Sequence, residues 1–63
     1  MFVYIITNEA NEVVSIRLTT SKDLTEAFEC AEKITKQISY MNDQKLKVSA
    51  VLEQKIYDAL SVE

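Results

Sequence analysis

The chain has 63 residues, a net charge of −3, no histidine, no glycine, no proline and a single cysteine. One cysteine excludes an internal disulfide, the absence of histidine removes the usual zinc ligand sets, and the absence of glycine excludes a glycine-rich phosphate loop. The length predicts one domain, 1–63, which buries only about 60% of its surface on folding. We therefore expect no metal or cofactor, and we expect an oligomer or a bound partner to supplement so small a core.

The start of the chain and its single thiol predict where the protein is located, and its charge pattern bears on nucleic-acid binding. The first apolar run is too short for a secretory signal core or a membrane span. With a lone thiol, Cys30, these features predict a reducing, cytoplasmic environment and no membrane contact. The charges are spread along the chain without a basic block, which argues against a nucleic-acid-binding tail.

Two alternating segments, residues 1–7 and 13–18, predict a β-hairpin. Residues 8–11 form the expected loop, with an asparagine at each end that accepts turn geometry. A register with Thr7 opposite Glu12 gathers the purely aliphatic residues on one face, which we expect to lie under the following helix. That aliphatic face consists of Val3, Ile5, Val14, Ile16 and Leu18.

A long amphipathic helix is predicted over about 21–41. Thr20 and Asp23 resemble a capping box at its start, and Asn42-Asp43 is the expected end. Cys30 lies at the margin of the apolar stripe, and without a histidine to act as base we expect it to be structural. The stripe has the spacing of three and four residues that marks one helix face: Leu24, Ala27, Ala31, Ile34, Ile38 and Met41.

The last third of the chain allows two interpretations. Alternating apolar residues from Leu46 to Leu52 predict a third strand over about 45–51, followed by a short helix over 53–60. A continuous C-terminal helix, giving a ββαα fold, is the alternative. The strand is favoured because an isolated hairpin is marginal. The predicted fold is therefore α+β: a ββαβ domain with antiparallel sheet order 2-1-3 and a short C-terminal helix.

In this topology one sheet face stays uncovered and carries an apolar stripe beside basic residues. Phenylalanine, tyrosine and arginine are enriched at the centres of protein interfaces. The alternative is that the C-terminal Leu52, Ile56 and Leu60 fold back over this stripe. If the stripe is exposed, Tyr4→Asp leaves the protein folded but unable to bind, whereas Ile16→Asp unfolds it. The predicted protein-binding residues are Phe2, Tyr4, Ile6, Val13, Arg17, Lys45 and Lys47.

The function predicted from these features is that of a non-enzymatic module that binds another protein, with an acidic surface as the expected contact, and inhibits or modulates it. The carboxylates, lysines and tyrosines show no grouping typical of a catalytic site. One alternative is a homodimeric structural protein that associates through a sheet face or a strand edge. Another is an antitoxin-like or single-strand nucleic-acid-binding protein, which the net negative charge disfavours.

In size, acidity and a composition rich in isoleucine, lysine and asparagine, the whole chain resembles the small accessory proteins with which bacteriophages inhibit or redirect host proteins. Antitoxins of phages are of similar length. The resemblance implies that the partner is a host protein and that the protein acts in the host cytoplasm.

Overall fold

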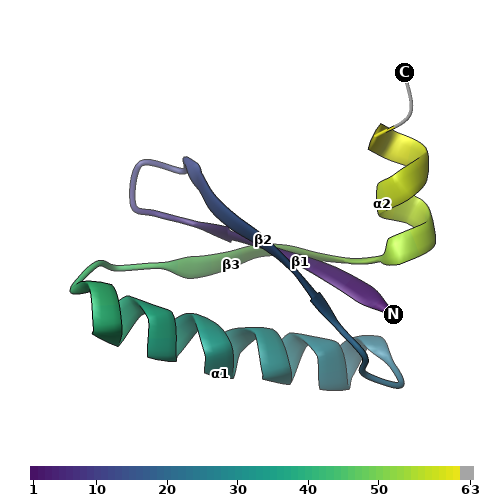
Figure 1. The fold of residues 1–63 in the computed structure, drawn as a ribbon, viewed down its shortest axis with the longest axis horizontal. Coiled ribbons are helices and arrows are strands. Elements are labelled where there is room, and N and C mark those ends of the chain that lie inside the picture. The colour runs from purple at the N-terminus through teal and green to yellow at the C-terminus, as the bar shows by residue number, and fades with distance from the viewer. Residues whose placement is uncertain (62–63) are drawn as a thin grey trace.

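The fold is a three-stranded sheet with one long and one short helix, seen in a computed structural model that describes residues 1–61 (Figure 1). The sheet is antiparallel with strand order β2-β1-β3. The predicted α+β class, strand order and third strand are therefore confirmed, and the continuous C-terminal helix is wrong. The elements are β1 (Phe2–Thr7), β2 (Val13–Thr19), α1 (Leu24–Asn42), β3 (Lys47–Glu53) and α2 (Gln54–Ser61).

The β1–β2 loop is held by one asparagine side chain, as its polar sequence predicts. The Asn8 side-chain oxygen accepts hydrogen bonds from the backbone N–H groups of Ala10 and Glu12, each at 3.0 Å. Asn11 adopts a positive φ of 62°, a conformation that asparagine tolerates better than most residues. The backbone N–H of Asn8 also donates to the carbonyl of Glu12 at 3.1 Å, which closes the hairpin one residue beyond Thr7.

The predicted hairpin register is wrong. Ile5 pairs with Ile16 rather than with Val14, and Thr7 pairs with Val13 rather than with Glu12. Two features cause the shift: the loop closes at Asn8 and Glu12, and a β-bulge then leaves Val14 without a partner. Because paired residues share a sheet face, the bulge also moves Val13 from its predicted face to that of Thr7.

Helix α1 begins three residues later than predicted, because Asp23 rather than Thr20 is its N-cap. The Asp23 carboxylate accepts a hydrogen bond from the backbone N–H of Glu26 at 2.8 Å, and Asp23 itself is extended. At the other end Asp43 is left-handed, with φ 51°, and ends the helix where the sequence predicted. Cys30 is half-buried on this helix, in agreement with its predicted place at the margin of the apolar stripe.

Helix α1 covers the opposite sheet face from the one predicted. It packs on Tyr4 and Ile6 of the central strand, which are 1% and 0% exposed, with Ala31 between them and the helix axis. Two physical reasons favour this face: aromatic side chains bury more apolar area than valine or isoleucine, and the small Ala27 and Ala31 leave room for them. Partly buried residues complete the core: Ile34, Ile38, Leu46, Val48 and Val51.

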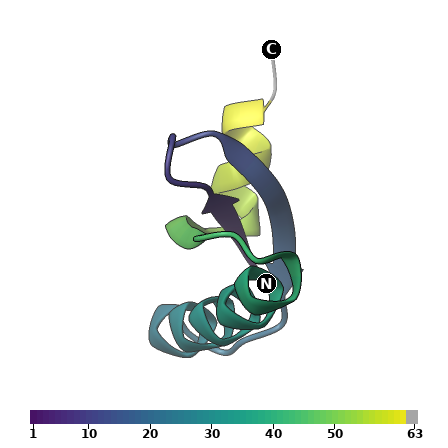
Figure 2. The same cartoon turned by 90° about the vertical axis from the view of Figure 1, so that its left-hand side faces the viewer.

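Helix α2 lies on the other side of the sheet from α1 (Figures 1 and 2). It follows β3 without a loop and is tied to the start of the chain by a hydrogen bond of 3.0 Å from the Gln54 N–H to the Met1 carbonyl. From there it rises away from the sheet, and Ile56 and Leu60 remain exposed. It therefore does not fold back over the aromatic stripe, and that alternative is also wrong.

Candidate protein-interaction surfaces

The structure divides the predicted binding residues among three places. Phe2, Tyr4 and Ile6 are buried beneath α1, so the prediction that they form an exposed surface is wrong. Val13 and Arg17 are exposed on β2, at one edge of the sheet. The other two, Lys45 and Lys47, are exposed near the opposite edge, at the start of β3.

The burial of Tyr4 has a consequence for its ionisation. Desolvation raises the pKa of the Tyr4 phenol above its ordinary value of 10.0, the nearby Arg17 charge partly offsets this rise, and Cys30 adds to it. Arg17 lies opposite Tyr4 in the antiparallel pair of β1 and β2, so its positive charge favours the ionised phenolate of Tyr4.

We expect the free energy of unfolding to fall as pH rises above about 10, since the unfolded chain then releases the Tyr4 proton while the native state retains it. The stabilisation from a neutral Tyr4 is complete below the unfolded-state pKa and is lost as pH rises through the folded-state pKa. Urea titrations between pH 8 and 11 test this. Tyr4→Phe should show a smaller fall than wild type, and an equal fall in both proteins would contradict the assignment.

The sheet face opposite α1, here called the outer face, is aliphatic across its centre. Leu18, Val3 and Leu52 lie side by side in one row of paired residues, and Ile16, Ile5 and Ala50 lie in the next. Val3, in the central strand, is only 2% exposed. Towards the β2 edge the face is open, and the exposed apolar residues there are Val13, Val14, Ile16 and Leu18.

Strand β2 is exposed to an unusual degree for part of a folded sheet. Only Ser15 and Thr19 of its seven residues are even partly buried. The cause is the placement of α1, which packs against β3 and β1 and has few contacts with β2. Figure 2 shows β2 passing along one side of the molecule. The strand therefore presents one edge and both faces to its surroundings.

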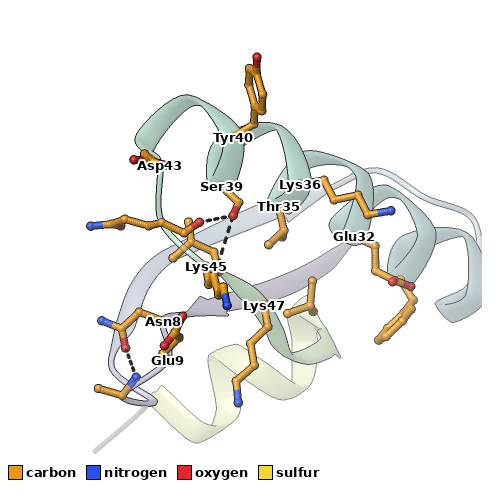
Figure 3. Close-up of a pocket in the computed structure, with 15 residues that line it drawn as sticks. Asn8, Glu9, Glu32, Thr35, Lys36, Ser39, Tyr40, Asp43, Lys45 and Lys47 are labelled. Carbon is orange, nitrogen blue, oxygen red and sulfur yellow. Dashed lines mark hydrogen bonds between the residues drawn. The ribbon is translucent and has the colours of Figure 1, made fainter.

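A second surface is a broad open hollow of about 1060 Å³ between α1, residues 43–48 and the β1–β2 loop (Figure 3). At the end of the hollow near the C-terminus of α1, the Ser39 hydroxyl donates a hydrogen bond to the Gln44 carbonyl and accepts one from the Leu46 N–H at 3.4 Å. These two bonds join the end of α1 to the chain that enters β3. Ser39 therefore has a structural role in connecting α1 to β3, and the sequence pattern did not predict this role.

The charges around this hollow do not converge on one ligand. Figure 3 shows Lys36 and Lys47 extending in different directions, and Thr35 lying between the helix and the strands. Thr35 is buried, and its hydroxyl has no hydrogen-bond partner in the described chain. Three lysines are matched by three carboxylates in the lining: Lys36, Lys45 and Lys47 with Glu9, Glu32 and Asp43. The hollow thus has no net charge that would select an acidic partner.

Comparison with known proteins found no matching family model, no matching curated protein and no matching solved structure. We therefore argue function from the residues of this chain. Within residues 1–61, histidine, cysteine, aspartate and glutamate side chains form no group of three that could hold a metal ion. In the same range no helix has the length and apolar character needed to cross a bilayer.

Sequence reasoning missed the outer face as a candidate surface because it assigned those aliphatic residues to the core. A signal for the correct assignment was present in α1. Its predicted stripe contains two alanines, Ala27 and Ala31, and small residues on a packed helix face complement large side chains on the facing strand. The central strand supplies aromatic side chains only on the face of Tyr4.

Proposed function

We propose that this protein is a non-enzymatic module that binds another protein through its outer face and thereby modulates it. The observation that carries the proposal is the row of exposed aliphatic side chains on β2, continuous with the aliphatic centre of the sheet. Small monomeric proteins seldom leave contiguous apolar patches open, and such patches commonly mark interaction sites. The proposed partner surface is apolar, since the two central rows of the face carry no charge.

Exposed residues of α2 support the same surface. Ile56 is 50% and Leu60 is 73% exposed, on the helix that rises from the outer side of the sheet. Because α2 lies on the outer side of the sheet, a partner placed on the outer face would lie near this helix as well as β2. The resemblance in size and composition to phage accessory proteins extends the proposal, with a bacterial host protein as the partner.

Two leucines provide a matched test of this surface. Leu18, on the outer face, is 53% exposed, and Leu24, at the start of α1, is 55% exposed. Both Leu18→Asp and Leu24→Asp should fold, because each replaces a half-exposed side chain. The wild type and both variants are used as baits in a bacterial lysate, and a retained protein is then purified and its affinity measured by calorimetry.

We expect wild type and Leu24→Asp to bind the purified partner equally, and Leu18→Asp to bind at least about 30-fold more weakly, as for a central interface residue. Equal binding by all three proteins would exclude the outer face as the contact. Retention of no partner by the wild type would contradict the proposed function itself.

A further inference from the structure

The two edges of the sheet are protected to different degrees. Exposed strand edges pair readily with other strands unless charges, bulges or neighbouring elements block them. Strand β3 begins at Lys47, ends at Glu53, contains a bulge at Ser49 and has α1 packed beside it. Strand β2 carries one charged residue, Arg17, and has few contacts with α1; its own bulge, at Val14, lies near its start, and the strand is regular from Ser15 to its end.

We infer that β2 pairs antiparallel with β2 of a second copy of this chain, around a two-fold axis at Ile16. Such a contact is isologous, so each residue pair in it occurs twice. Ile16 faces the partner's Ile16, Ser15 faces the partner's Arg17, and Val14 faces the partner's Leu18. The inference concerns the strand edge and does not depend on the outer face binding another protein.

Arg17 disfavours one of the alternative registers. Since an antiparallel pair keeps opposed side chains on one face, the two-fold axis must pass through a residue that meets its own copy. An axis at Arg17 would place two guanidinium groups opposite each other, which is unfavourable. An axis at Ile16 instead brings each Arg17 against a serine and keeps the exposed aliphatic residues of β2 together on the outer side.

The same asymmetry of the edges limits the assembly to two copies. Pairing of β2 uses the unprotected edge of each molecule and leaves β3 at both ends of a continuous six-stranded sheet, since each copy contributes three strands. The charges and the bulge of β3 then oppose further growth. The outer faces of the two copies become one continuous apolar surface, with the β2 residues at its middle.

Two substitutions of opposite charge at position 15 test the register. Ser15→Lys places two lysines opposite the partner's two arginines, and Ser15→Glu places two carboxylates there. We expect sedimentation equilibrium to give a dimer of the 7.2 kDa chain for wild type. The dissociation constant should rise in Ser15→Lys and fall in Ser15→Glu, with a difference of roughly tenfold or more between them. Circular dichroism confirms that both variants are folded.

A charge swap provides the control. Ser15→Lys combined with Arg17→Glu restores two opposite-charge pairs across the axis, so the double variant should dimerise more tightly than Ser15→Lys alone. A wild type that stays monomeric to millimolar concentration would overturn the inference. A dimer that ignores the charge at position 15 would also overturn it and would indicate association through the outer face. Ser15→Lys retains the outer face, so its binding to a partner protein tests the proposed function separately.

Discussion

Tyr4→Asp is expected to unfold the protein at room temperature. Tyr4 is 1% exposed and packs with Ile6 and Ala31 at the centre of the core. Truncating a buried aromatic residue costs about 3–5 kcal/mol, and burying an unpaired carboxylate adds to that cost. A single core in a chain of this length supplies only about 3–5 kcal/mol of net stability, so the substitution exceeds what the fold can lose.

Far-UV circular dichroism and a urea titration measure this effect, with Ile16→Asp as the control. Ile16 is in the same hairpin but is 48% exposed, and at concentrations where both proteins are monomeric its variant should remain folded with a loss of no more than about 1 kcal/mol. This is the reverse of the outcome expected from the sequence pattern alone. A folded Tyr4→Asp with an unfolded Ile16→Asp would show that α1 covers the aliphatic face after all.

Much of the topology could be predicted because local patterns determine it. Each segment has a single hydrophobic period that predicts its secondary structure. Apolar residues alternate in the first two segments and again after Leu46, and they are spaced by three and four residues in the middle of the chain. Asn8, Asn11 and Asp43 then mark the turns, through side-chain hydrogen bonds or tolerance of a left-handed backbone. Strand order followed from the need of a hairpin for a third strand, and it is confirmed.

The choice of the buried sheet face could not be predicted with the same rules, because both faces of the hairpin are apolar. Alternation divides the residues into two sets, but it does not say which set meets the helix. That choice depends on packing between elements, here between the large Tyr4 and the small Ala31. The bulge at Val14 could not be predicted either, since no residue near it in the sequence indicates that the strand contains an extra, unpaired residue.

The predicted binding surface was partly wrong for the same reason. Arg17, Lys45 and Lys47 were correctly placed at the surface, and they lie on opposite edges of the sheet as the predicted strand order requires. The aromatic centre of the predicted site is core, so these three charges do not surround a common contact surface. The aliphatic residues first assigned to the core are the exposed ones, and they support a contact with an apolar partner rather than an acidic one.

The second large effect is expected from Ala31→Leu, which should destabilise the protein by about 1–3 kcal/mol through overpacking. Ala31 is fully buried against the central strand, on a helix whose Ala27 is also fully buried, and a longer side chain at this position would force α1 away from Tyr4. In a domain of this size each kcal/mol lowers Tm by about 4–8 °C. Thermal unfolding followed by circular dichroism measures the change.

Ala59→Leu is the matched control, because Ala59 is an exposed residue of α2 and both residue types favour helices. Its Tm should stay within a few degrees of wild type, since surface substitutions usually change stability by less than about 0.5 kcal/mol. If Ala31→Leu is as stable as Ala59→Leu, the helix does not approach the sheet closely at Ala31. The size complementarity of alanine and tyrosine then cannot be the reason why α1 covers the aromatic face, and the aliphatic outer face loses its physical explanation.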